Sequence, residues 1–180
     1  DAWLAGIFPD VFDEGFAKTA LRIAKEQCFP LLQDGNILGW FTDNELKWAP
    51  DWRGKDEILV QFLKMEKGAP GKLSAVSILK KKYDDDMSEF NRTWKTDFKS
   101  WDELLSNREI KAPVSRDKKI EQNMEAERSL KDAFMADCDS FLAELADRYF
   151  RITIGAIKEV DPNHLVFGCR FAYVPPEPVV

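Results

Sequence analysis

The sequence predicts an α/β fold in which parallel β-strands are joined by α-helices. Two short and almost wholly apolar runs, residues 37–42 and 165–171, have the composition of strands that are covered on both faces. Helical periodicity occurs before the first run and again between the two runs. The resulting order of helix, strand, helices and strand is typical of a parallel sheet with helical crossovers.

The helices are expected where apolar residues recur every three or four positions. The first runs from Gly15 to about Phe29, because the following Pro30 disfavours a helical conformation in the residue before it. The longest signal runs from Ser129 to Val160 and ends at a turn that leads into the second strand. Between the strands we expect helices at 58–65, 71–83 and 87–94, and an exposed connection or surface helix at 106–128.

Composition and charge restrict the class of partner. The chain has 180 residues, of which 44% are hydrophobic and 32% charged, as in a globular domain with a hydrophobic core. The net charge is -6 and the two signs are interleaved, whereas binding to nucleic acid or to an anionic membrane requires clustered Lys and Arg. We therefore expect neither nucleic acid nor membrane as a partner.

The cysteines and the single histidine argue against a metal site. Cys28, Cys138 and Cys169 are far apart and odd in number, and they lack the spacing of zinc ligands. Three buried free thiols are the simplest interpretation, and one disulfide stays open. His164 is the only histidine, which removes most histidine-based metal sites and catalytic triads. We expect no metal and no cofactor.

Polar residues follow the first apolar strand, and an arginine lies near the end of the second. Asp43, Asn44 and Glu45 come directly after residues 37–42, and Arg170 is expected at the same edge of the sheet. Active sites of α/β barrels lie at the carboxyl ends of their strands. Glycoside hydrolysis needs a carboxylic acid that protonates the leaving oxygen, and Glu45 can supply it. The alternative is a structural carboxylate paired with Arg170.

The loop after the first strand carries Trp48 and Trp52, and Trp40 lies close by. Indole rings stack on the apolar faces of sugars, so this cluster favours a carbohydrate ligand. Packing in the core is the alternative for about half of these rings.

Three segments resemble beta-agarase-type glycoside hydrolases: residues 8–13 (FPDVFD), 37–48 (ILGWFTDNELKW) and 161–171 (DPNHLVFGCRF). Residues 91–96 (NRTWKT), with Phe98 and Trp101, are similar to a segment that these enzymes share with beta-galactosidase-like relatives. The segments span nearly the whole chain in the right order. The DNE and DPNHL-x-x-G-x-R elements are specific in combination.

This resemblance implies a (β/α)8 TIM barrel, retaining chemistry and a galactan-type polysaccharide substrate such as agarose. It places 37–45 as the fourth barrel strand and 165–171 as the fifth, with His164 in a structural role at the opposite end. It assigns Glu45 as general acid/base, Asn44 to the sugar 2-hydroxyl, and Arg170 to binding the substrate or orienting a carboxylate. Asp43, Trp48 and Trp52 complete the expected substrate site, and the enzymes of this family are secreted or periplasmic.

One departure from the family concerns the catalytic nucleophile. The family's nucleophile is a glutamate after the seventh strand, and the only late carboxylate here is Glu177, in a proline-rich loop. Since a complete barrel takes about 250 residues, we expect residues 1–180 to be the middle part of a single catalytic barrel.

Two other classes of protein compete with this interpretation. A non-catalytic carbohydrate-binding or scaffold protein with an incomplete barrel would explain the missing nucleophile. An unrelated α/β enzyme acting on phosphorylated substrates is disfavoured, because no glycine-rich loop follows either strand. The sequence does not predict the oligomeric state.

Overall fold

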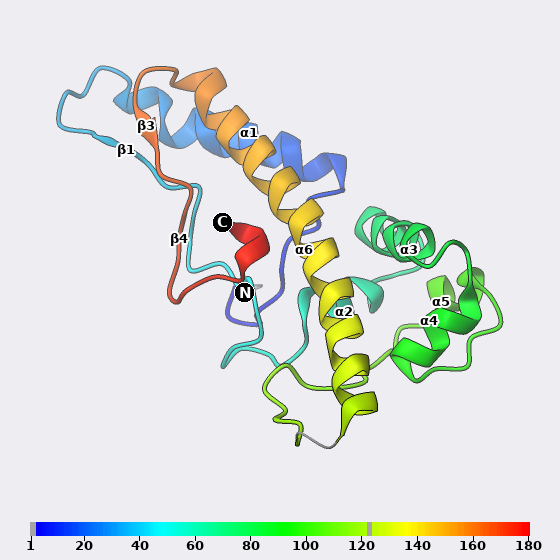
Figure 1. The fold of residues 1–180 in the computed structure, drawn as a ribbon. Helices are drawn as coiled ribbons and strands as arrows, with labels where there is room; N and C mark the ends of the chain where they lie inside the picture. The colour runs from blue at the N-terminus through cyan, green and yellow to red at the C-terminus, as the bar shows by residue number, and fades with distance from the viewer. Residues whose placement is uncertain (1–2, 122–123) are drawn as a thin grey trace. The chain divides into compact units, whose positions relative to one another are not determined.

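The computed structural model describes residues 3–121 and 124–180, which divide into two compact units. Unit 1 consists of residues 3–54 and 143–180, and unit 2 consists of residues 55–142. The long helix α6 (Glu125–Val160) begins in unit 2 and ends in unit 1 (Figure 1). Its range confirms the long helix expected at 129–160, with one further turn at the start.

Helix α1 (Glu14–Gln27) confirms the first predicted helix to within two residues at each end. It begins where the side chain of Asp13 accepts a hydrogen bond from the backbone N–H of Gly15, a standard N-cap. It ends at Cys28, and the short 3₁₀ helix η1 (Phe29–Leu31) follows, with Pro30 in its first turn.

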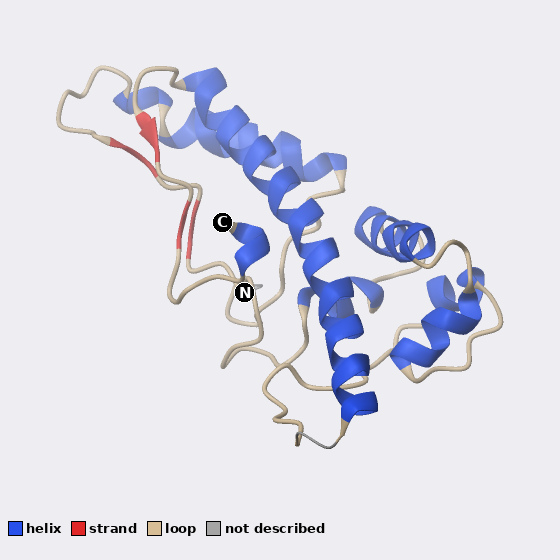
Figure 2. Ribbon diagram, viewed as in Figure 1, coloured by secondary structure: helices blue, strands red, loops and turns tan. Residues whose placement is uncertain are grey.

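Both predicted strands are present, and they pair in parallel. Strand β1 (Gly39–Trp40) pairs with β3 (Leu165–Val166), and β2 (Asp43–Asn44) pairs with β4 (Cys169–Arg170). Figure 2 shows how short these strands are beside the helices, which hold about half of the described residues. The predicted order of helix, strand, helices and strand is therefore confirmed, and the strands pair in parallel as expected.

Each expected strand is interrupted in the middle, and the cause is Gly168. This residue has φ 76°, a left-handed conformation that L-residues seldom adopt, and it bends the second segment. The ladder nevertheless continues, because Thr42 N–H donates to the Gly168 carbonyl and Phe167 N–H donates to the Trp40 carbonyl, both at 2.8 Å. The register is the same on both sides of the bend.

The carboxyl end of the first segment differs from the prediction. Asp43 and Asn44 were expected after the strand, but they form β2 itself, so the strand ends immediately before Glu45. The reason is that pairing with β4 outweighs the low strand propensity of Asp and Asn.

The buried carboxylate of Asp161 fixes the turn between α6 and β3. Its Oδ2 accepts hydrogen bonds from Trp40 Nε1 at 2.8 Å and lies 2.7 Å from His164 Nδ1. Its Oδ1 accepts from the backbone N–H groups of Asn163 and His164. Burial alone would raise the pKa of Asp161, but these hydrogen bonds outweigh burial and lower that pKa to about 2.

The core of unit 1 has two parts. Four buried side chains of α1, its C-cap and α6 pack together, namely Ala24, Cys28, Ala156 and Ile157. An aromatic group surrounds Trp48, whose ring stacks on Phe150 at 5.5 Å and meets Phe8 and Tyr149 edge to face. These two groups join α1, α6 and the strand pair into one body.

Unit 2 is helical and consists of α2 (Ile58–Leu63), α3 (Pro70–Lys82), α4 (Met87–Trp94), α5 (Trp101–Ser106) and the start of α6. In its core the buried carboxylate of Asp137 accepts hydrogen bonds from Tyr83 Oη at 2.7 Å and Trp94 Nε1 at 2.8 Å. Lys82 Nζ lies 2.9 Å from the same carboxylate. This buried charge is therefore paired and hydrogen-bonded.

The predictions for unit 2 hold for α2, α3 and α4, whereas α5 was missed. Its signal is the capping pattern of Ser100 and Glu103. The Ser100 hydroxyl accepts from the N–H of Glu103, and the Glu103 carboxylate accepts from the N–H of Lys99. The connection expected at 106–128 is mostly coil up to α6, except for residues 122–123, which lie outside the described residues. Its Ile110 and Val114 are buried rather than exposed.

The three cysteines are free and buried, as expected. Within residues 3–121 and 124–180, no helix combines the length and the apolar character that crossing a bilayer requires.

Replacing Gly39 with Ala is expected to destabilise the strand pair. The added Cβ would lie 2.4 Å from the carbonyl oxygen of Leu165, so the two backbones would have to separate. We expect a loss of about 1–3 kcal/mol in the free energy of unfolding, as for other overpacked sites. The control is Gly35→Ala, where the new Cβ meets nothing within 4 Å. Equal denaturation midpoints for the two variants would contradict the pairing of β1 with β3.

Replacing Asp161 with Asn is expected to destabilise the fold in a pH-dependent way. Hydrogen bonds to a charged group contribute more than neutral ones, so we expect a loss of about 1–3 kcal/mol at neutral pH. Because folding lowers the pKa from 3.8 to about 2, the ionised carboxylate stabilises the fold fully above pH 4. This stabilisation is lost as the pH falls from 4 to 2. Denaturation of both proteins across that range should show their difference shrinking, and a constant difference would refute the charged state.

Candidate active site

Three of the predicted site residues meet at the carboxyl ends of β2 and β4. The register places Asn44 opposite Arg170, and Glu45 follows directly. Arg170 Nε donates to Asn44 Oδ1 at 2.9 Å, while the two terminal nitrogens of Arg170 lie 3.5 and 3.3 Å from Glu45 Oε1. The side chains of Arg170 and Glu45 are 51% and 33% exposed, so a ligand can reach this group.

Glu45 has an unusual backbone conformation. Its φ is 58°, in the left-handed region, which costs an L-residue about 1–2 kcal/mol. Its N–H donates to the carbonyl of Arg170 at 2.8 Å and thereby extends the ladder by one residue. Strained conformations of this kind persist only where the surrounding contacts enforce them, and they concentrate at functional sites.

Two side chains that the sequence did not indicate bind the backbone of this pair. Arg53 donates from a terminal nitrogen to the carbonyl of Glu45 at 2.9 Å. Trp3 donates from Nε1 to the carbonyl of Asn44 at 3.1 Å. Trp3 lies 41 positions from its acceptor, so no local pattern could have predicted its contact.

The two tryptophans of the predicted substrate site have different environments. Trp52 is 72% exposed and lies edge to face with Trp3, with the ring centroids 6.4 Å apart. Trp48 is only 1% exposed and packs among the aromatic side chains of the unit 1 core. A buried ring offers no face to a sugar, so Trp52 rather than Trp48 is the ring of this pair that a ligand can reach.

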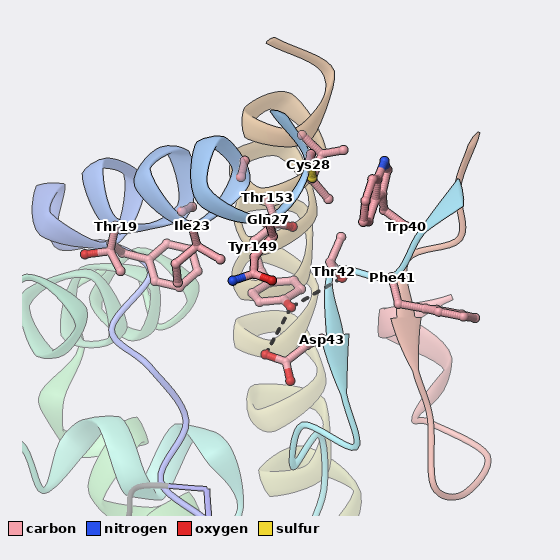
Figure 3. Close-up of a pocket in the computed structure, with 14 residues that line it drawn as sticks. Thr19, Ile23, Gln27, Cys28, Trp40, Phe41, Thr42, Asp43, Tyr149 and Thr153 are labelled. Carbon is pink, nitrogen blue, oxygen red and sulfur yellow. Dashed lines mark hydrogen bonds between the residues drawn. The ribbon is translucent and has the colours of Figure 1, made fainter. Parts of the chain in front are cut away.

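The side chain of Asp43 points away from Asn44, Glu45 and Arg170. Its carboxylate accepts from the N–H of Asn44 at 2.6 Å and lies 3.5 Å from the hydroxyl of Tyr149, and burial raises its pKa. Figure 3 shows Asp43 at the margin of a cavity of about 220 Å³ between α1, α6 and the first strand segment. The cavity is mainly apolar, and Asn44, Glu45 and Arg170 are not among the residues that line it.

Two further features bear on the chemistry of the site. Glu177 was expected in a proline-rich loop, but it begins the short 3₁₀ helix η2 (Glu177–Val179). In the part of the chain that the structure describes, no three His, Cys, Asp or Glu side chains are grouped so that they could hold a metal ion.

The left-handed conformation of Glu45 predicts an inverted order of stability between two variants. Glycine adopts this conformation without steric cost, so Glu45→Gly should be more stable than Glu45→Ala by about 1 kcal/mol. The matched control is Glu144, an exposed position inside α6. There the alanine variant should be the more stable by about 1 kcal/mol. Finding alanine the more stable at both positions in chemical denaturation would contradict the strained backbone.

The chain as a whole is similar to known proteins. No protein-family model matches the chain. The chain is 30% identical over 179 residues to beta-agarase A of Vibrio sp. (strain JT0107), an alignment that covers 93% of this chain and 16% of that protein. It is 26% identical over 176 residues to beta-agarase B of the same strain, covering 96% of this chain and 16% of that protein.

A solved structure described as an exo-beta-agarase has the same fold as this chain. The TM-score is 0.74 at 28% identity, and the match covers 96% of this chain and 22% of that one. The chain thus spans about 16% of the length of the curated relatives that it matches. The resemblance to beta-agarase-type glycoside hydrolases is therefore confirmed, and it extends over nearly the whole chain.

Proposed function

We propose that this chain is the middle part of the catalytic barrel of an agarase-like retaining glycoside hydrolase, with Glu45 as the general acid/base. The observation that carries the proposal is the meeting of Asn44, Glu45 and Arg170 at the carboxyl ends of two parallel strands. The relatives named as beta-agarases support the reaction class.

The strand pair has the features of two neighbouring barrel strands. Figure 3 shows helices α1 and α6 on one side of the first strand segment, with the ring of Phe41 directed away from them. Its ring lies 5.2 Å from that of Phe167, and the two are 54% and 43% exposed. Among the described residues each pair has only two strands, so both outer edges are unpaired. Further strands of a (β/α)8 barrel would pair with these edges and cover the apolar face.

In this barrel the strand segments of residues 37–45 and 165–171 would be the fourth and fifth strands. Residues 1–180 would belong to one catalytic domain, with unit 2 inserted in the sequence between them. A shared domain of this kind fits relatives that are about six times as long as the matched segment.

Each residue of the group has a distinct part in the proposed chemistry. The carboxyl group of Glu45 protonates the departing glycosidic oxygen and later deprotonates the attacking water. Asn44 has its Oδ1 bound by Arg170, so its NH₂ group is what it offers to a sugar 2-hydroxyl. Arg170 orients Glu45 and carries a positive charge to the edge of the site.

The catalytic nucleophile of the retaining reaction is a second carboxylate about 5–5.5 Å from the first. Asp43 does not fit this role, because its carboxylate is directed to Tyr149 on the other side of the strand. We propose that a glutamate on a later barrel strand of a longer protein supplies it.

The substrate proposed for the site is a galactan-type polysaccharide such as agarose. The exposed ring of Trp52 provides a stacking surface for a sugar near Glu45. The interleaved charges and the net charge of -6 fit a neutral polysaccharide better than nucleic acid or an anionic membrane. A secreted or periplasmic location fits a polymer that cannot enter the cell.

The test is Glu45→Gln in the protein that carries this chain, with Glu144→Gln as the control. Loss of general acid/base catalysis should lower the turnover of agarose about 10²–10⁴-fold. Binding of agarose-derived oligosaccharide, measured by calorimetry, should persist because glutamine keeps the shape of the side chain. The control should retain full activity.

The same experiment decides between a hydrolase and a non-catalytic carbohydrate-binding protein. If neither the unmodified protein nor Glu45→Gln releases products while both bind the oligosaccharide, the binding-protein alternative holds. Full turnover by Glu45→Gln would exclude Glu45 as the acid.

A further inference from the structure

The side chain of Arg53 binds the backbone of Glu45, the proposed acid, and does not bind its carboxyl group. Its Nη1 donates to the carbonyl of Glu45, while the N–H of Glu45 donates to the carbonyl of Arg170. Both backbone polar groups of Glu45 are therefore bound. Because the backbone geometry sets the direction in which a side chain leaves, fixing these groups fixes the direction of the carboxylate.

Arg53 is itself rigidly placed. Its Nε and Nη2 donate to Asp51 Oδ2 at 2.9 and 2.6 Å, and its backbone N–H donates to Asp51 Oδ1 at 2.8 Å. Its side chain is only 2% exposed. The turn that carries it closes through hydrogen bonds in both directions between Asp51 and Gly54. A buried and ion-paired guanidinium of this kind loses little freedom when it donates one further hydrogen bond.

Two indole rings flank the same guanidinium. The carbon at its centre lies 4.8 Å from the ring centroid of Trp3 and 5.7 Å from that of Trp52, within the range of cation–π attraction. Trp3 in turn donates to the carbonyl of Asn44. The exposed Trp52 ring, the proposed sugar-stacking surface, therefore rests on the cation that holds Glu45.

The N-terminal segment is fitted closely to this cluster. Gly6 has φ 63°, and a Cβ added to it would lie 2.8 Å from the Cβ of Arg53. A larger residue at position 6 would therefore be both strained and too close to Arg53. The N-terminal segment thus meets Arg53 at two points, the ring of Trp3 and the backbone of Gly6.

We propose that Arg53 and Trp3 are positioning residues, which hold the Asn44–Glu45 backbone in its left-handed turn so that the Glu45 carboxyl group meets the departing oxygen. This inference rests on the function proposed above for Glu45. Neither side chain touches the substrate in this role. Trp52 sets the distance between the stacked sugar and the carboxyl group because it packs on the same guanidinium.

The test uses two variants in the protein that carries this chain. Arg53→Lys keeps the charge beside Asp51, but a single ammonium cannot bind that carboxylate at two points and also reach the Glu45 carbonyl. Trp3→Phe keeps an aromatic ring near Arg53 but removes the N–H that binds Asn44, together with the five-membered ring that carries it. The control is Arg22→Lys, an exposed i,i+4 ion pair with Glu26 on α1.

The readout is kcat/KM on two aryl glycosides of an agarose-derived oligosaccharide, one with phenol and one with 2,4-dinitrophenol as the leaving group. The better leaving group departs without protonation, so a defect in acid positioning affects it little. Misplacing the carboxyl group should lower kcat/KM of Arg53→Lys about 100-fold on the phenyl substrate. The loss on the dinitrophenyl substrate should be much smaller, and Arg22→Lys should change neither value.

Glu45→Gln, measured on the same pair of substrates, separates this proposal from the proposed function. Equal losses on both substrates in Glu45→Gln would overturn the acid role of Glu45 itself. If Glu45→Gln shows the dependence on leaving group but Arg53→Lys loses activity equally on both substrates, or loses none, only the positioning role is overturned. Should Arg53→Lys fail to fold, Trp3→Phe decides by the same criterion.

Discussion

The register of one parallel strand pair is the constraint on which the site depends. Pairing is the same before and after the bend at Gly168, and it sets Asn44 opposite Arg170. A shift by one residue would exchange the two faces of the strand, and would separate the arginine from the amide and the carboxyl group. The buried carboxylate of Asp161 supports this register, because it joins the turn before β3 to Trp40 of β1.

The structure holds Glu45 in a conformation that its own residue type disfavours. Arg170 binds the side chain and the N–H of Glu45, and Arg53 binds its carbonyl. Contacts from two separate segments therefore offset the free-energy cost of the left-handed conformation. Preorganisation of this kind lets a carboxyl group act without first being ordered by the substrate.

Much of the fold followed from the sequence because it rests on local patterns. Periodicity located α1, α3, α4 and α6, and the two apolar runs located the strand pair and its polar end. The direction of the Asp43 side chain was not predicted, because the expected strand stopped at residue 42 whereas Asp43 lies within β2. Successive residues of a strand face opposite sides, so Asp43 and Asn44 within β2 cannot share one site. The burial of Trp48 and the contacts of Arg53 and Trp3 depend on tertiary packing, which spacing along the chain does not encode.

The most direct test of the central claim is a crystal structure of the Glu45→Gln protein bound to an agarose-derived oligosaccharide. The account predicts a glycosidic oxygen within hydrogen-bond distance of the residue 45 carboxamide, with Asn44 on the neighbouring 2-hydroxyl and a sugar stacked on Trp52. An oligosaccharide bound elsewhere, with the side chains of residue 45 and Arg170 untouched, would contradict it.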